Sequence, residues 1–296
     1  MKDDEKTLKE HQRPLTVEEQ IENLEDIGLI IEDKEYAKSV LQKISYFRLI
    51  KAYSLGLKEK NGNYYEVVTF RNIVDLYTFN ADFRKILFPI IESVEVSLRC
   101  NVSNFFCCKY GVLGYKNKDF FVVEEYYDEF ILNIKDEIKR NSRSLFVRNF
   151  KENYDGGDLP FYALVEIVSF GTLSKFYKNL NNPDKKEIAK CYGVGYTYFE
   201  SWIECLANIR NICAHYGRLY NAKLTKTPIL YKEYSENKIG NNRVFGALIC
   251  LKYIVKEDEW MDFIMELEKL INEYDGVDIK SMGFPKDWKE VLTQER

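Results

Sequence analysis

Histidine is scarce in this chain: its 296 residues include two, His11 and His215. His11 lies in a charged N-terminal stretch, so histidine acid–base chemistry near neutral pH in the folded part must use His215. The seven cysteines form no Cys-x-x-Cys pair and are odd in number, which argues against a zinc or disulfide framework. The Gly-x-x-x-x-Gly-Lys-Ser/Thr motif is also missing, so we expect no nucleotide-driven step. The sequence therefore predicts no metal and no cofactor.

Long apolar runs are missing as well. None approaches the ~20 residues needed to span a bilayer, so we expect no membrane association. The charged start, Met1–Lys6, lacks the apolar core of a signal peptide, which together with the cysteine usage predicts a cytoplasmic protein. The net charge of −4 argues against indiscriminate coating of nucleic acid but is compatible with a local basic cleft.

Alternating strand patterns are nearly absent, whereas apolar residues recur at helical spacing along most of the chain. This periodicity predicts an all-α fold, a helical bundle. Pro89 predicts a kink in the helix that contains it. An apolar stripe on that helix, expected to face the core, comprises Ile90, Ile91, Val94, Leu98, Val102 and Phe105. We expect helices at about 16–28, 33–44, 70–110, 124–141, 160–180, 184–191, 196–216, 243–255 and 257–274.

The same reading divides the chain into four parts. The Asn61-Gly62-Asn63 turn signal marks the edge of the main domain. We expect a flexible tail over residues 1–15, a small N-terminal helical segment over 16–66, the main helical domain over 67–275 and a C-terminal segment over 276–296. The high aromatic content, 15%, predicts core and interface packing, with base stacking as the functional alternative.

Basic residues gather in two stretches. No Asp or Glu occurs between Cys205 and Lys232, a stretch that contains Arg210, Arg218, Lys223 and Lys226. A second stretch comprises Lys139, Arg140, Arg143, Arg148 and Lys151. Each is explained either as a solvated helix face or as a surface that contacts phosphate.

Residues 210–215 read Arg-Asn-Ile-Cys-Ala-His and combine an imidazole with a planar cation suited to phosphate. Arg210 and His215 are five apart, about 140° around an ideal helix, whereas Asn211 and His215 share a face. Cys213 is most simply a small buried apolar residue. A lone histidine also serves as a structural hydrogen-bonding group, so spacing alone leaves both interpretations open.

Three collinear segments resemble one known family. Residues 202–221, which contain the Arg-Asn-x-x-x-His motif, closely resemble the signature helix of the Abi-like (abortive infection) family, a branch of the HEPN superfamily. Residues 159–174, Leu-Pro-Phe-Tyr-Ala-Leu-Val-Glu-Ile-Val-Ser-Phe-Gly-Thr-Leu-Ser, and residues 44–49, Ile-Ser-Tyr-Phe-Arg-Leu, resemble two further segments of that family. The resemblance spans about residues 16–255 and implies a HEPN-like helical bundle.

The resemblance also implies an activity. HEPN ribonucleases cut RNA without a metal, and most use a composite site at a homodimer interface. By this likeness His215 is the expected acid–base group, Arg210 holds the scissile phosphate and Asn211 orients these groups or binds substrate. The products would carry 2′,3′-cyclic phosphate ends. The implied role is antiphage defence or a toxin–antitoxin system, with an antitoxin or a small regulatory RNA as restraining partner.

Four further residues are candidates for supporting roles. Glu95 and Arg99 lie four apart in the order that favours an ion pair. They are explained either as a surface pair or, by the family likeness, as polar groups that face the Arg–His helix. Arg218 and Lys223 would extend the phosphate track. Two rival functions remain open: an RNA-binding module that does not cut, and a protein-interaction component of a toxin–antitoxin pair in which Arg210 and His215 are buried.

Overall fold

The structure is a computed structural model that describes residues 13–295. In this range the elements are helices, and pairing between extended segments is limited to isolated bridges, so the predicted all-α class is confirmed. His11 and most of the tail predicted over residues 1–15 lie outside the described residues. None of the helices in the described range combines the length and apolarity needed to cross a membrane.

The chain divides into two compact units, Met1–Thr78 and Phe79–Arg296. The first unit contains α1 (Val17–Asp26), α2 (Lys34–Leu41) and a π-helical turn (Phe47–Lys51). Helix α1 begins with a capping box, because Thr16 Oγ1 accepts from the Glu19 amide and the Glu19 carboxylate accepts from the Thr16 amide. The turn at residues 61–63 connects two short extended segments, which pair through one antiparallel bridge between Lys58 and Tyr64.

The long helix α3 (Phe70–Tyr110) begins in the first unit, continues through Pro89 without interruption and supplies the second unit with its longest element. The remaining α-helices of the second unit are α4 (Glu124–Arg140), α5 (Leu145–Asn153), α6 (Phe161–Leu164), α7 (Phe170–Lys178), α8 (Asn182–Lys190), α9 (Tyr196–Ala214), α10 (Lys232–Glu236), α11 (Val244–Ile254), α12 (Glu257–Glu273) and α13 (Trp288–Thr293).

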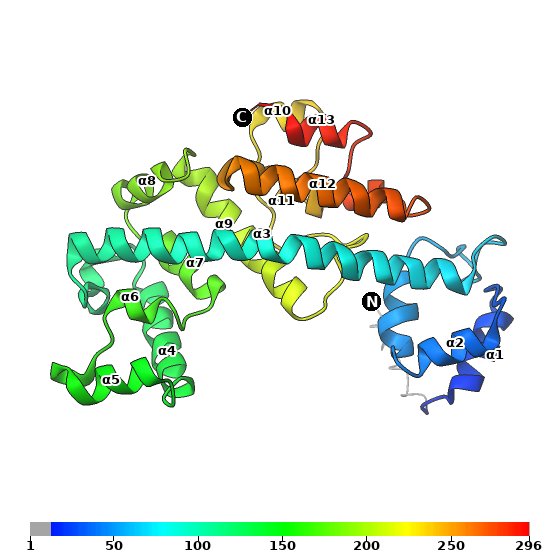
Figure 1. The fold of residues 1–296 in the computed structure, drawn as a ribbon, viewed down its shortest axis with the longest axis horizontal. Coiled ribbons are helices and arrows are strands. Elements are labelled where there is room, and N and C mark those ends of the chain that lie inside the picture. Colours follow the sequence, from blue (N-terminus) through cyan, green and yellow to red (C-terminus); the bar gives the residue numbers. More distant parts are fainter. Residues whose placement is uncertain (1–12, 296) are drawn as a thin grey trace, which may run out of the picture. The chain divides into compact units, whose positions relative to one another are not determined.

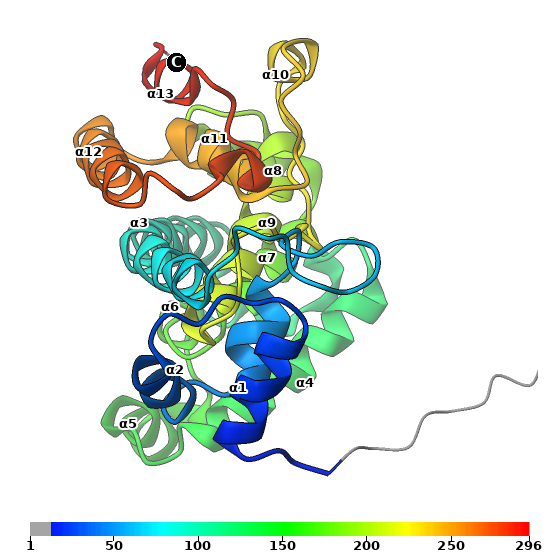
Figure 2. The ribbon, with the colours of Figure 1, turned by 90° about the vertical axis from the view of Figure 1, so that its right-hand side faces the viewer.

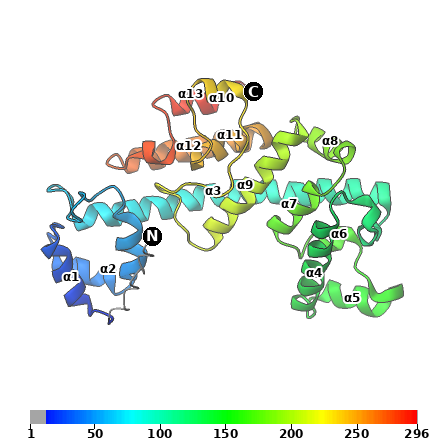
Figure 3. The same cartoon turned by 180° about the vertical axis from the view of Figure 1, so that it is seen from behind.

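Within the second unit, α12 lies alongside α3 (Figures 1 and 2). Ser93 Oγ donates to Glu259 at the start of α12, and the Tyr274 hydroxyl just beyond its end donates to Asp82, so the two helices are antiparallel. Helix α9 crosses α3 on the side that faces the viewer in Figure 3. It packs against α7, α8 and α11, which makes it the central element of this part of the core.

An aromatic cluster fills the core between α3, α4, α6 and α7. Phe106 stands at its centre, with ring contacts to Phe121, Phe161 and Phe176 at centroid distances of 5.0 to 6.1 Å. The predicted stripe on α3 is buried except at its last member, because Phe106 rather than Phe105 enters the core. The high aromatic content is therefore largely explained by packing.

The prediction of one continuous helix over residues 160–180 is wrong, because the chain forms two helices there. Residues 165–169 form a turn between α6 and α7, where β-branched Val165, Ile167 and Val168 favour the helix weakly. Ser169 then starts a new helix, because its hydroxyl accepts from the Thr172 amide at 3.0 Å. Helices α5, α10 and α13 are not predicted from the sequence. All three are shorter than ten residues, which leaves their periodicity weak.

Candidate functional site

Helix α9 carries the Arg-Asn-x-x-x-His motif and is fixed by its apolar face. Its buried face includes Trp202, Cys205, Leu206, Ile209 and Cys213. The Trp202 indole donates to the Ile229 carbonyl at 2.6 Å, so its polar atom is satisfied in the core. Burial raises the pKa of the Cys213 thiol to about 12, which keeps it protonated and confirms the expected buried apolar role.

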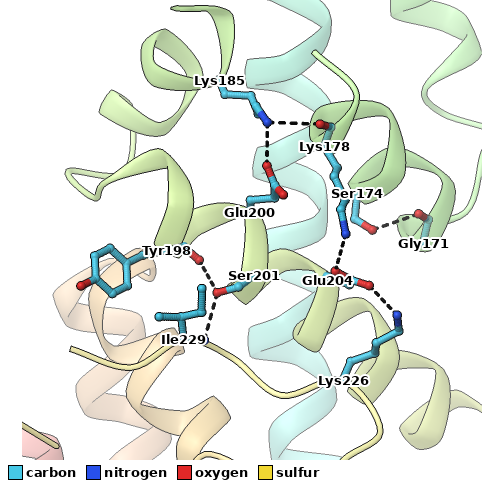
Figure 4. Close-up of polar contacts among 10 residues, drawn as sticks. All are labelled: Gly171, Ser174, Lys178, Lys185, Tyr198, Glu200, Ser201, Glu204, Lys226 and Ile229. Atoms are coloured by element: carbon cyan, nitrogen blue, oxygen red, sulfur yellow. Dashed lines mark hydrogen bonds and ion pairs between the residues drawn. The ribbon is translucent and has the colours of Figure 1, made fainter. Parts of the chain in front are cut away.

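Polar contacts fix the outer side of the same helix (Figure 4). The Glu204 carboxylate lies between Lys178 of α7 and Lys226, with N–O distances of 3.3 and 2.6 Å. One turn earlier, Glu200 pairs at 2.8 Å with Lys185 of α8, which is nearly buried. These bonds hold α9 against α7, α8 and the segment that follows it. The motif at its C-terminal end therefore stands on a rigid support.

The helix ends directly at the candidate histidine, which is its C-cap. The Gly217 amide donates to the Ile212 carbonyl at 2.7 Å and the Tyr216 amide to the Cys213 carbonyl at 3.2 Å, the two bonds of a Schellman ending. Tyr216 has φ 57°, the left-handed conformation that this ending requires and that glycine usually supplies. A Cβ at Gly217 would lie 2.8 Å from the Ile212 side chain, so the turn is packed tightly.

Two buried polar residues of α3 hold this turn from the other side. Arg84 Nη1 donates to the Gly217 carbonyl at 2.9 Å. Asn80 Oδ1 accepts from the Leu219 and Tyr220 amides at 2.8 and 2.9 Å. Asn80 is fully buried and Arg84 nearly so, which makes these bonds strong constraints on the backbone beside His215. Neither residue is singled out by the sequence, because each lies more than 130 positions from its partner.

The candidate arginine is held by a buried carboxylate. Glu95 of α3 is 5% exposed, and its Oε2 accepts from Arg210 Nε at 3.0 Å. Its Oε1 accepts from Arg99, which also donates to the Val165 carbonyl. The Arg210 guanidinium lies over the Phe88 ring at 5.8 Å. The Glu95–Arg99 pair is therefore no surface ion pair: both residues are largely buried, and Glu95 faces α9.

The candidate residues occupy different sides of α9. Arg210 faces α3, and its side chain remains 32% exposed. Asn211 and His215 are exposed, and Asn211 lines a cavity bordered by α4 and α7. Within residues 13–295 no hydrogen bond or ion pair joins the His215 imidazole to Arg210. The structure thus joins Glu95, Arg99 and Arg210 in one network and leaves His215 open to solvent nearby on the same helix.

The basic residues after the motif are only partly available to a ligand. Lys226 and Lys232 pair with Glu204 and Glu236, so much of the positive charge in this stretch is neutralised. Arg218 is half-buried, and its Nη1 atom is enclosed. Lys223 is exposed. In the second basic stretch Arg140 pairs with Glu137, and all five cations are exposed.

In the part of the chain that the structure describes, no group of three or more His, Cys, Asp or Glu side chains is placed to hold a metal ion.

Among known proteins, a family model described as Abi-like protein matches residues 39–221, well over half of the chain. No curated protein and no solved structure matches the chain.

Proposed function

The chain belongs to the Abi-like protein family, and on that premise we propose that it is a metal-independent endoribonuclease with a HEPN-like fold. It would act in an abortive-infection or toxin–antitoxin system. One observation supports this most directly: an exposed histidine ends a buried helix, and the same helix carries an arginine fixed by a buried carboxylate.

The charge of this network suits an anionic substrate. Glu95 contributes one negative charge, while Arg99 and Arg210 contribute two positive charges, so one positive charge remains uncompensated within the trio. Arg210 is the more exposed of the two arginines. Its ion pair uses Nε, and its two terminal nitrogens are the donors that a phosphate would engage. A preorganised cation of this kind stabilises charge that develops on the phosphate in the transition state.

RNA supplies its own nucleophile, the ribose 2′-hydroxyl. Cleavage needs a base that removes its proton, an acid that protonates the departing 5′-oxygen, and a cation on the phosphate. His215 would transfer the protons and Arg210 would hold the phosphate, with Asn211 orienting the substrate. The bond between phosphorus and the 5′-oxygen breaks as the 2′-oxygen bonds to phosphorus, which leaves a 2′,3′-cyclic phosphate and a 5′-hydroxyl.

One described histidine per chain supplies one imidazole, whereas the reaction uses a base and an acid. A homodimer with twofold symmetry would bring two His215 and two Arg210 side chains to one composite site. In each protomer, hydrogen bonds from Arg84 and to Asn80 fix the turn that follows His215, so both imidazoles would be held by rigid backbone. RNA is the proposed substrate, and an antitoxin or a small regulatory RNA the proposed restraint.

Substitution of the two motif residues tests the proposal. Labelled single-stranded RNA is incubated with wild type, His215→Ala and Arg210→Ala in EDTA, with His11→Ala as the matched histidine control. We expect losses of about 10²–10⁴-fold for His215→Ala and 10²–10³-fold for Arg210→Ala, with no loss for the control. Full activity of His215→Ala would rule out the assignment. RNA that is bound but left intact by wild type would favour the non-catalytic binding module.

A further inference from the structure

A cavity lies along the face of α9 that leads to His215. It has a volume of about 310 Å³ and is bordered by α4, the first turns of α7, α9 and Lys226. On α9 it is lined by Glu204, Ala207, Asn208 and Asn211. Asn211 lies four residues before His215, about 6 Å along the helix, and shares its face. The cavity therefore lies on the side of α9 that leads to His215, the proposed acid–base group, and not on the side that carries Arg210.

The charged side chains that line this cavity are two lysines and two glutamates, and they form two ion pairs. Lys175 pairs with Glu129 at 2.5 Å across α7 and α4. Lys226 pairs with Glu204 at 2.6 Å, and Figure 4 shows that carboxylate between two lysines on the side of α9 that faces α7. An anion would find its cations already occupied. A neutral and polar group fits this balance better than a phosphate does.

Amide side chains supply the hydrogen-bonding groups of the cavity. Asn133 of α4 lines it together with Asn208 and Asn211 of α9. Within the described range no hydrogen bond engages the Asn211 side-chain amide, which leaves a donor and an acceptor beside each other. Asn133 uses its amide nitrogen to bond the Glu129 carbonyl. Paired donors and acceptors of this kind match the edge of a nucleobase.

The protein's own packing does not require a glycine at position 171, on the wall of the cavity. Its φ lies outside the left-handed region, and a Cβ built on it would meet only Ser169 Oγ, at an ordinary 3.7 Å. A glycine within a helix is destabilising relative to alanine, and neither strain nor crowding requires one here. A remaining use of glycine is close approach of a ligand to the backbone. The missing side chain keeps this wall of the cavity open.

We propose that this cavity is a nucleobase subsite, which receives one unstacked base of single-stranded RNA next to the cleaved linkage. The proposal rests on the proposed ribonuclease function and names how its substrate is selected. Base-edge recognition of this type requires a base turned out of its stack, as in single strands, loops and bulges. Residues 169–174 supply much of the cavity wall, and the cleavage chemistry does not use them.

Filling the cavity tests the subsite. In Gly171→Leu the new side chain occupies the space beside Asn211, while Gly276→Leu is a matched control. Gly276 also lacks left-handed φ and has no atom within 4 Å of an added Cβ. Circular dichroism and thermal melts establish that both variants fold. We expect Gly171→Leu to raise the KM for a short single-stranded RNA by about tenfold and to change which linkages are cut, whereas Gly276→Leu cuts as wild type does. An unchanged KM and cleavage pattern in folded Gly171→Leu would overturn the subsite and leave the ribonuclease proposal standing.

Binding separates the subsite from catalysis. His215→Ala protein is titrated with short labelled homopolymeric RNAs, and fluorescence anisotropy gives the affinity for each base. We expect one base to bind best, and Asn133→Leu to reduce that preference about fivefold or more while a phosphate-dependent affinity remains. Equal affinity for all bases in the parent protein, or a preference that survives both Asn133→Leu and Gly171→Leu, would overturn the subsite even if cleavage itself is confirmed.

Discussion

Among the charged residues of the candidate site, Glu95 is the one whose substitution should destabilise the protein most. In Glu95→Ala, Arg99 loses a partner while its side chain is 13% exposed, and Arg210 loses its partner at 32% exposed. Removal of one member of a buried ion pair costs about 3–5 kcal/mol, whereas a pair near the surface contributes about 1 kcal/mol or less. We therefore expect Glu95→Ala to lower the free energy of unfolding by about 3–5 kcal/mol. Arg210→Ala, which leaves the Glu95–Arg99 pair intact, should cost only about 1 kcal/mol.

Urea unfolding followed by circular dichroism measures both free energies. The variant with both substitutions, Glu95→Ala and Arg210→Ala, completes a double-mutant cycle. The Glu95–Arg210 coupling should be about 1 kcal/mol, with an unchanged dependence on urea concentration. Lys223→Ala, an exposed cation, is the control and should unfold like wild type. An Arg210→Ala cost equal to that of Glu95→Ala, or a coupling near zero, would refute the argument that Glu95 orders Arg210. Activity of Glu95→Gln should fall although its shape is kept, because the charge that orients Arg210 is gone.

Three further predictions concern the surroundings of the site. Tyr216→Gly should raise the free energy of unfolding in urea by roughly 0.5 kcal/mol, because it relieves a left-handed φ; a variant that is less stable than wild type contradicts this. Lys226 hydrogen-bonding holds the pKa of Glu204 below its usual 4.5, so its stabilisation is present above that pH and is lost as pH falls through the lower folded value. Glu204→Gln should thus cost on the order of 0.5 kcal/mol at pH 7 in thermal melts and nothing near pH 2, while an equal cost at both would be inconsistent with this pairing. Alkylation of the native protein followed by mass spectrometry should modify the exposed thiols quickly and spare the buried ones until the protein unfolds; early labelling of a buried thiol would contradict the packing. The exposed thiols are Cys100, Cys108 and Cys191, and the buried ones are Cys205, Cys213 and Cys250.

Local signals in the sequence predict the helices well. The helices predicted over residues 16–28 and 196–216 are found as α1 and α9, within two residues of those bounds at each end. The break between α6 and α7 is missed, because an apolar segment of this length satisfies helical periodicity on either side of a turn. Phe105 and Phe106 are adjacent and equally apolar, and tertiary packing alone decides which one enters the core.

The site is predicted less completely, because its contacts are distant in sequence. Arg210, Asn211 and His215 stand out as residue types, and the family likeness adds Glu95. The partnership of Arg210 with Glu95 spans 115 positions, and the clamp of Arg84 on Gly217 spans 133. No local pattern encodes such pairs. Burial of Glu95 is equally non-local, since it follows from α9 crossing α3 (Figure 3).

The chemical identity of the new RNA ends tests the central claim most directly. Wild-type protein is incubated with single-stranded RNA in EDTA, and the 5′ fragments are analysed by mass spectrometry. Attack by the 2′-hydroxyl predicts a 2′,3′-cyclic phosphate on each fragment, and a single 2′-deoxynucleotide at a cut position should abolish that cut. Fragments that end in a free 3′-hydroxyl, or cleavage that continues at the 2′-deoxy position, would contradict the account.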